Sequence, residues 1–128
     1  MDKIINVIKV AFAILGGTLE FALGGCDMLL SVLISLTVLD FISGVVLAVM
    51  NKELQSGAAY NGIAKKIGIY IIISMSVLVG YAIKTPELRG IIIGFYIAHE
   101  AISIVENCAA LGLPIPQKIK DVLAQIKN

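Results

Sequence analysis

Four long apolar runs, separated by short polar stretches, dominate the sequence. They cover roughly residues 4–25, 28–50, 67–83 and 91–112. Each is near the length of about 20 residues that an α-helix needs to cross a bilayer core. Helices are the expected structure, because every backbone amide in lipid must be paired within its own segment. The pattern predicts an all-α integral membrane protein with about four transmembrane helices, or three if the first run does not span.

The connections between the runs differ in length and composition. Cys26 and Asp27 are expected to form a very tight turn, and residues 84–90 a short turn that contains a proline. Residues 51–66 are rich in polar residues and glycine and are predicted to form a loop. The chain contains no internal repeat and no sign of a second domain, so residues 1–128 are interpreted as one transmembrane domain.

A short amphipathic helix is predicted over residues 117–127. Pro114 and Pro116 separate it from the fourth run, because proline cannot continue a helix. We expect its apolar face to lie on the membrane surface, with the charged residues of the segment largely elsewhere. That face consists of Ile119, Val122, Leu123 and Ile126.

Composition supports the membrane assignment and excludes other classes. Of the 128 residues, 59% are hydrophobic, and the mean hydropathy is +0.97, whereas soluble domains are about 45–50% apolar. The net charge of +1 gives no indication of a nucleic-acid partner. Cys26 and Cys108 have no CxxC or metal-ligand spacing, so they are interpreted as packing residues rather than a disulfide.

The distribution of cations predicts the orientation. With four spans and both termini in the cytoplasm, eight cations lie inside, and only Lys84 and Arg89 lie outside. With three spans the division becomes six against four, so the positive-inside rule favours four. We therefore expect a multi-pass membrane protein with both termini in the cytoplasm. The eight inside cations are Lys3, Lys9, Lys52, Lys65, Lys66, Lys118, Lys120 and Lys127.

The first run is the weakest of the four spans. It contains Glu20, and it is interrupted by glycines, among them Gly16, Gly17 and Gly24. One alternative is a helix that lies on the membrane surface. Another is a signal peptide, although this composition makes a poor apolar region for one.

The fourth run carries a stripe of six polar residues. Their spacing of i, i+3, i+4, i+7, i+10 and i+11 places them on one helical face. A charge at mid-bilayer costs about 2.5–3.5 kcal/mol on insertion scales, so the stripe is expected to face other helices or water. It consists of Tyr96, His99, Glu100, Ser103, Glu106 and Asn107.

Two interpretations of this stripe remain open. Its members pair with each other inside a helix bundle, or they line water after oligomerisation. A metal site is disfavoured, since His99 has no second histidine at helical spacing. The sequence contains no nucleophile elbow, phosphate loop or catalytic triad. We therefore expect neither an enzyme nor a cofactor.

The other runs carry weaker polar and small-residue faces. Glu20 and Asp40 are intramembrane carboxylates in the first and second runs. Small residues let helices approach closely, and polar residues hydrogen-bond across the contact. The predicted packing residues, which we expect to serve contacts between subunits as well, are Gly16, Gly17, Gly44, Ser76 and Gly80.

Three segments resemble the phage holin family, which also includes clostridial toxin-secretion holins. They are LDFISGVVLAV (39–49), SGAAYNGIAKKIG (56–68) and FYIAHEAISIVENCAALGLPIPQKIKDVLAQIK (95–127). The most specific part is the pattern E-x-x-S-x-x-E-N-x-x-x-x-G-x-P-x-P, which begins at Glu100 and ends at Pro116. The resemblance covers about two-thirds of the chain, in the family's order.

The resemblance implies a function. Such proteins accumulate in the bacterial cytoplasmic membrane, form homo-oligomers and open holes that release a cell-wall hydrolase or a toxin, without binding that cargo directly. An antiholin is a possible further partner. A cargo of about 200 residues is about 40 Å across, and a ring around it needs on the order of 15 helices.

Two functions other than that of a holin are also compatible with the sequence. One is a small four-helix proton-coupled transporter, in which Glu20 is the membrane-embedded carboxylate. The other is an antiholin or a membrane adaptor that makes no pore. Toxicity on expression and proton-coupled efflux of a cationic dye separate these alternatives from a holin.

Overall fold

The protein consists of five α-helices in the computed structural model, which describes residues 1–127 and the side chains of residues 1–125. The helices are α1 (Asp2–Ala22), α2 (Met28–Met50), α3 (Ser56–Ala82), α4 (Glu87–Ala110) and α5 (Gln117–Lys127). The first four are long and apolar enough to cross a membrane. The predicted all-α membrane class, with its short C-terminal helix, is therefore confirmed.

The predicted loop at 51–66 is wrong, because α3 begins at Ser56 and only residues 51–55 connect it to α2. This stretch is polar, but its residues also favour a helix. Alanines and lysines are good helix formers, and they outweigh Gly57 and Gly62. As a result, Lys66 lies ten residues inside a helix rather than in a loop.

α2 and α5 have the predicted bounds, whereas the ends of α1 and α4 differ from the predicted ones by two to four residues. α1 spans Asp2–Ala22 rather than 4–25, because Gly24 and Gly25 take positive φ angles and end it. α4 spans Glu87–Ala110 rather than 91–112, and it begins directly after Pro86, whose fixed φ suits a helix start.

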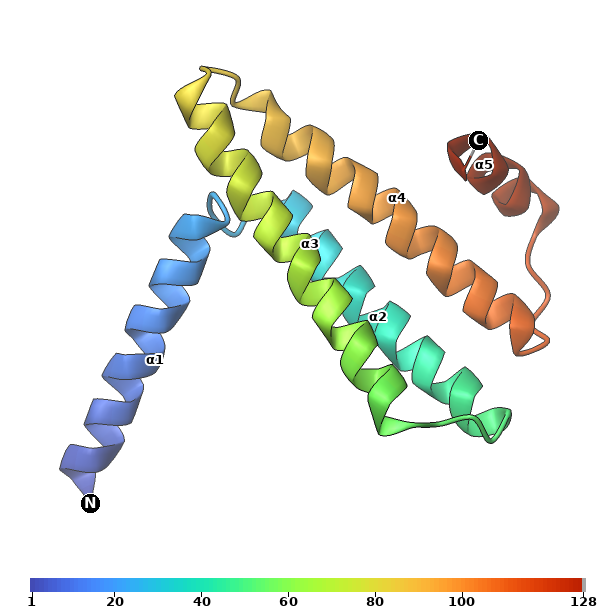
Figure 1. Cartoon of the computed structure of the whole chain (residues 1–128), viewed down its shortest axis with the longest axis horizontal. Helices are drawn as coiled ribbons and strands as arrows, with labels where there is room; N and C mark the ends of the chain where they lie inside the picture. Colours follow the sequence, from blue (N-terminus) through green and yellow to red (C-terminus); the bar gives the residue numbers. More distant parts are fainter. Residues whose placement is uncertain (128) are drawn as a thin grey trace.

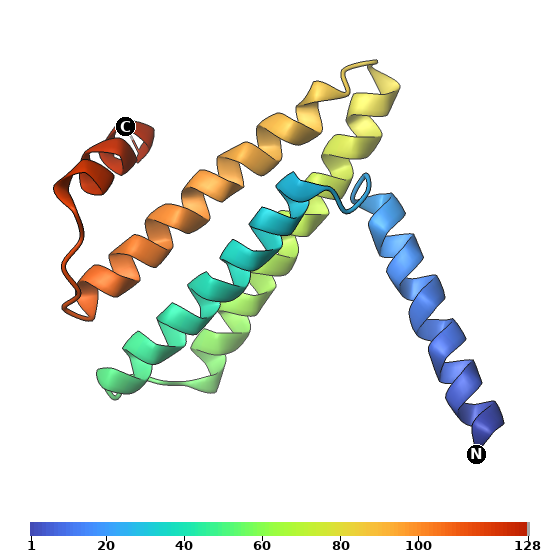
Figure 2. The same ribbon diagram turned by 180° about the vertical axis from the view of Figure 1, so that it is seen from behind.

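The helices α2, α3 and α4 form a bundle (Figures 1 and 2). α2 packs along α4, while α3 and α4 meet at the 83–86 turn and diverge away from it. We call the end with this turn and the 23–27 loop the Arg89 end, and the end with the 51–55 loop the open end. From the 23–27 loop α1 diverges from the bundle, and α5 folds back beside α4.

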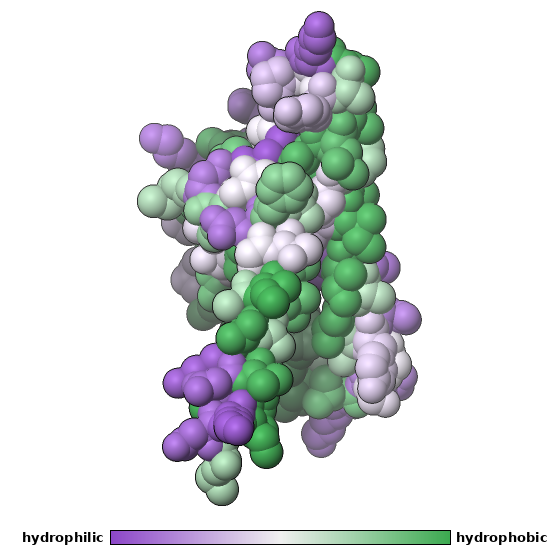
Figure 3. Space-filling model, turned by 90° about the vertical axis from the view of Figure 1, so that its left-hand side faces the viewer, coloured by the Kyte–Doolittle hydropathy of each residue, from purple (hydrophilic) through white to green (hydrophobic). Residues whose placement is uncertain are grey.

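Few apolar side chains are buried inside the bundle. Among the described residues they are Leu30 and Leu33 of α2, Ile69 and Ile73 of α3, and Ile93 of α4. Most large apolar side chains point outward, and Figure 3 shows a continuous band of hydrophobic residues along one side of the molecule. A surface of this kind suits lipid. Because lipid is as apolar as leucine, polar contacts and close packing must hold the helices together.

Candidate functional site

One cation and two carboxylates meet where the three bundle helices face each other. Asp40, Lys66 and Glu100 each lie ten residues from the helix end at the open end of the bundle, namely Met50, Ser56 and Ala110. At 1.5 Å per residue this places all three about 15 Å inside their helices. Equal depth on three helices brings them into one layer.

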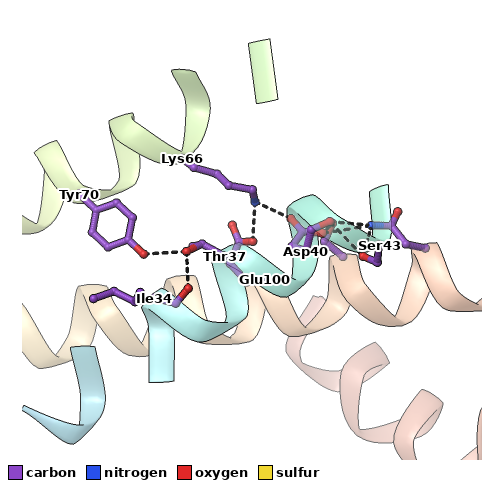
Figure 4. A network of polar contacts seen from close by, with 9 residues as sticks. Ile34, Thr37, Asp40, Ser43, Lys66, Tyr70 and Glu100 are labelled. Atoms are coloured by element: carbon purple, nitrogen blue, oxygen red, sulfur yellow. Dashed lines mark hydrogen bonds and ion pairs between the residues drawn. The ribbon is translucent and has the colours of Figure 1, made fainter. Parts of the chain in front are cut away.

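The Lys66 ammonium connects all three helices. Its Nζ lies 2.7 Å from Oδ2 of Asp40 and 2.8 Å from Oε2 of Glu100 (Figure 4). The Glu100 side chain is only 3% exposed, so this carboxylate depends on protein partners rather than on water. Removing one partner from a buried ion pair leaves an uncompensated charge, which is strongly destabilising.

Neutral donors from α4 complete the layer. Ser103 Oγ donates to Oδ1 of Asp40 at 2.6 Å, and Asn107 Nδ2 donates to the same oxygen at 3.2 Å. Asn107 Nδ2 also donates to Ser43 Oγ at 2.9 Å. We call Asp40, Lys66, Glu100, Ser103 and Asn107 the Lys66 cluster. It gives α2 and α4 a fixed register at mid-bundle.

A second polar contact joins α2 to α3 one turn away. The hydroxyl groups of Thr37 and Tyr70 lie 2.8 Å apart, and Thr37 also donates to the carbonyl of Ile34 at 2.8 Å (Figure 4). Thr37 is buried, so this contact extends the polar layer toward the Arg89 end.

The predicted stripe of α4 divides into an inner row and an outer edge. Glu100, Ser103 and Asn107 point toward α2 and α3, and Tyr96 is half-buried beside them. His99 and Glu106 are exposed, and His99 stacks on Phe95 with ring centroids 6.4 Å apart. The six residues do share one face of the helix, but that face is wider than the contact with α2 and α3.

A second charged cluster lies at the Arg89 end. Arg89, in the first turn of α4, donates from Nε to the Leu23 carbonyl at 2.7 Å and from an Nη to the Gly25 carbonyl at 2.9 Å. Its other Nη lies 2.8 Å from Oδ2 of Asp27. Asp27 also caps α2 by accepting from the Leu30 amide at 3.0 Å. We call Leu23, Gly25, Asp27 and Arg89 the Arg89 cluster.

Asp27 of this second cluster lies in the loop between α1 and α2, outside the membrane-spanning helices. The hydrogen bond from Arg89, followed by that from the Leu30 amide, lowers the pKa of Asp27 from 3.8 to about 2. The Asp27 side chain is 51% exposed, so solvent screens much of this attraction.

Glycine matters at two positions of the Arg89 end. Gly24 has a φ of +82°, and a Cβ there would lie 2.7 Å from Arg89 Nε. Gly80, on α3, allows the 83–86 turn to fold back, since a Cβ there would lie 2.7 Å from the Thr85 carbonyl oxygen. A larger residue at Gly24 would displace the Arg89 side chain, and one at Gly80 would displace the 83–86 turn.

The other predicted packing residues divide between contacts within the chain and open surface. Gly44 faces Asn107 of α4, and Ser76 is buried in α3, where it donates to the Ile73 carbonyl. Gly16 and Gly17 of α1 face open space, since a Cβ at either position would meet no other helix within 4 Å. They lie, like Glu20, on a helix in which no residue is buried.

Sequence reasoning missed the central roles of Lys66 and Arg89. Both were counted only as cations that mark the membrane faces. The available signal was the pair of intramembrane acids, Asp40 and Glu100, which require a positive partner in the same layer. The sequence of α3 offers that partner at the matching depth only if its helix begins near Ser56.

Comparison with known proteins supplies the family. The sequence model described as the bacteriophage holin family matches residues 17–128, which include α2 to α4 and both charged clusters. The chain belongs to the bacteriophage holin family. It thus shares its family with membrane proteins of phages, in agreement with the four apolar helices.

Individual relatives extend this result across the chain. An uncharacterized 14.9 kDa protein of Clostridium perfringens is 39% identical over 130 aligned residues, covering 100% of this chain and 98% of the relative. A probable holin of Bacillus phage phi105 is 36% identical over 104 residues, covering 77% of this chain and 74% of the phage protein. No solved structure matches the chain significantly.

Proposed function

We propose that this chain is a holin that assembles with copies of itself in the bacterial cytoplasmic membrane and opens holes there. A cell-wall hydrolase or a toxin then leaves the cell through these holes without binding the holin. Family membership and similarity to a probable phage holin support the proposal. The structural observation that carries it is the Lys66 cluster, which places charge deep within apolar helices.

A single chain has no room for a passage in this layer. Lys66 bridges α2 and α4 with contacts of 2.7 and 2.8 Å, so the three helices are tied together at this layer. A hole for a folded protein about 40 Å across needs on the order of 15 helices around it. Several chains must therefore contribute helices to one hole, with lipid and other copies of the chain as the partners of the apolar surfaces.

We further propose that both termini and the 51–55 loop face the cytoplasm. Four spans in series return the chain to the side on which it began. Lys65 and Lys66 lie inside α3 and no longer count as loop cations, which leaves six of the eight inside cations against Lys84 and Arg89 outside. The Arg89 cluster then lies at the outward-facing surface of the cytoplasmic membrane.

The outer edge of the α4 stripe is the part we assign to water or a neighbouring subunit in the hole. His99 and Glu106 are exposed on the single chain, whereas Glu100 of the inner row is buried. Glu106→Gln keeps the shape and removes the charge, so the onset of lysis should shift while insertion persists. Glu106→Leu should leave protein levels intact but delay or abolish permeabilisation. Normal levels and normal dye entry in both variants would contradict this assignment.

Expression in a bacterial host tests the function itself. Membrane-inserted protein, entry of an impermeant dye and release of a cytosolic reporter enzyme are measured in one culture. A holin should give abrupt dye entry and reporter release once it has accumulated. Accumulation without either would identify an antiholin or an adaptor. Proton-coupled efflux of a cationic dye from vesicles, with no reporter release, would identify a transporter.

A further inference from the structure

The bundle leaves a groove between α3 and the α2–α4 pair, towards the open end. Its volume is about 600 Å³. Small residues line its walls, including Gly44, Ala58 and Gly62, and Asp40, Lys66 and Glu100 lie at its floor. A groove with small walls admits the side chains of another helix, because the backbones can approach closely.

The same chain carries a helix without a partner. None of the 21 residues of α1 is buried, and α1 diverges from the bundle in both views (Figures 1 and 2). Its N-terminus points to the same end as the 51–55 loop. We propose that the groove receives α1 of a second copy of this chain, with Lys9 of that helix beside the carboxylates of the Lys66 cluster. The proposal rests on the proposed function, in which several chains surround one hole.

Charge favours this occupant. Three carboxylates (Asp40, Glu53 and Glu100) and two ammonium groups (Lys65 and Lys66) line the groove, so with the carboxylates ionised it carries one excess negative charge. Lys9 is the cation that α1 carries within its apolar length. An additional ammonium beside two carboxylates in a medium of low dielectric is attracted far more strongly than in water.

Depth in the membrane agrees as well. Lys9 lies seven residues from Asp2, or about 10 Å inside α1, whereas the carboxylates lie about 15 Å inside their helices. The four-carbon stem of a lysine bridges the remaining difference of about 5 Å. Lys3, at the very end of α1, lies too near the membrane surface to reach the same layer.

The chain's own α1 is on the wrong side of α3. The end of α1 lies beside Ser74, Val77 and Tyr81 of α3. The groove is lined by Ala58, Lys65 and Ile72, which a period of 3.6 residues per turn places largely on the opposite face of α3. The Arg89 cluster holds the connecting loop at that position. The helix that enters the groove therefore comes from another chain.

Each chain would then donate α1 to one neighbour and receive α1 from the other. Such head-to-tail contacts form a ring when the rotation between neighbours closes. The arrangement thus provides a route from a closed single-chain bundle to a ring.

Cysteine cross-linking tests the contact in a background with Cys26→Ser and Cys108→Ala. Ile5 lies three residues after the start of α1, and Ala59 lies three residues after the start of α3; both starts are near the open end. Ile5→Cys in one tagged chain should therefore form a disulfide with Ala59→Cys in a differently tagged chain. Tyr60→Cys is the control, because it lies only one residue deeper but is turned by 100° around α3, outside the groove lining. We expect a mixed-tag dimer with Ala59→Cys, little with Tyr60→Cys, and a ladder from the chain carrying both Ile5→Cys and Ala59→Cys.

The role of Lys9 is tested in the same assay. Lys9→Gln should reduce the mixed-tag dimer severalfold, and Lys3→Gln should not. With Glu100→Gln in the receiving chain the excess charge is gone, so the dimer should become insensitive to Lys9→Gln. Sensitivity that persists would overturn the proposed partner of Lys9.

Other outcomes overturn the groove contact. An intramolecular disulfide without a ladder would show that the chain's own α1 fills the groove. Equal cross-linking at Ala59→Cys and Tyr60→Cys would show unspecific collisions, and none at either would leave lipid as the occupant. Dye entry is measured with the cysteine-free chain in parallel. Permeabilisation without the expected cross-link refutes the contact alone, whereas absence of permeabilisation refutes the proposed function.

Discussion

The Lys66 and Arg89 clusters use the same chemistry at different depths. Each joins α4 to earlier parts of the chain through a basic side chain and at least one carboxylate. The Lys66 cluster lies about 15 Å inside its helices, and its Glu100 side chain is 3% exposed. The Arg89 cluster lies at the helix ends, where the Asp27 side chain is 51% exposed.

This difference in depth determines what each cluster contributes. A charge that loses its partner in the membrane interior has no water to replace that partner, whereas a charge at the surface is rehydrated at once. The Lys66 cluster should therefore be required for the bundle to exist. The Arg89 cluster should instead determine how the 23–27 loop, and with it α1, is directed.

The largest effect is expected from Lys66→Met. This change leaves the Asp40 and Glu100 carboxylates close together without a cation, and we expect a loss of about 3–5 kcal/mol in the free energy of unfolding. The melting temperature in detergent and the amount of inserted protein should both fall. Lys65→Met is the matched control, since Lys65 is exposed on the same helix.

Charge balance provides a second check on the Lys66 prediction. In the triple variant Lys66→Met, Asp40→Asn, Glu100→Gln the charged groups are gone while the shapes of the α2 and α4 side chains persist. Much of the lost stability should return. A triple variant as unstable as Lys66→Met alone would show that lysine packing, not charge, is what the bundle needs.

A smaller effect is expected from Arg89→Gln. The change removes donors to the Leu23 and Gly25 carbonyls and the ion pair with Asp27, but water replaces them, so we expect about 2 kcal/mol. Arg89→Lys should be intermediate, because an ammonium cannot supply the same fork of donors. Limited proteolysis of the 23–27 loop should accelerate more than the melting temperature falls. Equal sensitivity to Arg89→Gln and Lys66→Met would contradict the comparison of depths.

The membrane class and the faces of the helices could be predicted from sequence. Length, hydropathy and the spacing from Tyr96 to Asn107 depend only on period and composition, which the chain displays directly. The division of that stripe could not be predicted. It depends on how much of the face α2 and α3 cover, and so leaves Glu100 buried but His99 exposed.

The start of α3 at Ser56, and with it the position of Lys66 inside a helix, could not be predicted from the local sequence. Residues 56–66 look like a loop because polar and glycine residues are frequent there, and only the tertiary partners of Lys66 explain why a helix is stable. Arg89 was missed for a related reason. Its main acceptors are the backbone carbonyls of Leu23 and Gly25, which leave no trace in residue identity.

Gly24 and Gly25 allow backbone strain to be distinguished from a steric clash with Arg89. Gly24 and Gly25 both have positive φ angles, +82° and +97°, so alanine is strained at either position. Only at Gly24 would the new Cβ meet Arg89, at 2.7 Å from Nε, and nothing lies within 4 Å at Gly25. We expect Gly24→Ala to cost about 1 kcal/mol more than Gly25→Ala, measured as melting in detergent. In an Arg89→Gln background the difference should shrink, and a constant difference would show that Arg89 is not the obstacle.

The smallest effect is a pH dependence that belongs to Asp27. Its pKa is lowered from 3.8 in the unfolded chain to about 2 in the folded one, chiefly by the hydrogen bond from Arg89. A lowered pKa contributes stability that is complete above about pH 4 and is lost as the pH falls toward about 2. Asp27→Asn is the comparison, because asparagine caps α2 nearly as well but carries no charge. The melting temperature of the wild type should exceed that of Asp27→Asn by a constant amount above about pH 4, and the two should converge near pH 2. In an Arg89→Gln background this convergence should be absent, because the ionised and the protonated carboxyl group of Asp27 no longer differ in their contact with Arg89. A gap between wild type and Asp27→Asn that persists unchanged at pH 2 would mean that the Arg89–Asp27 ion pair contributes through shape rather than charge.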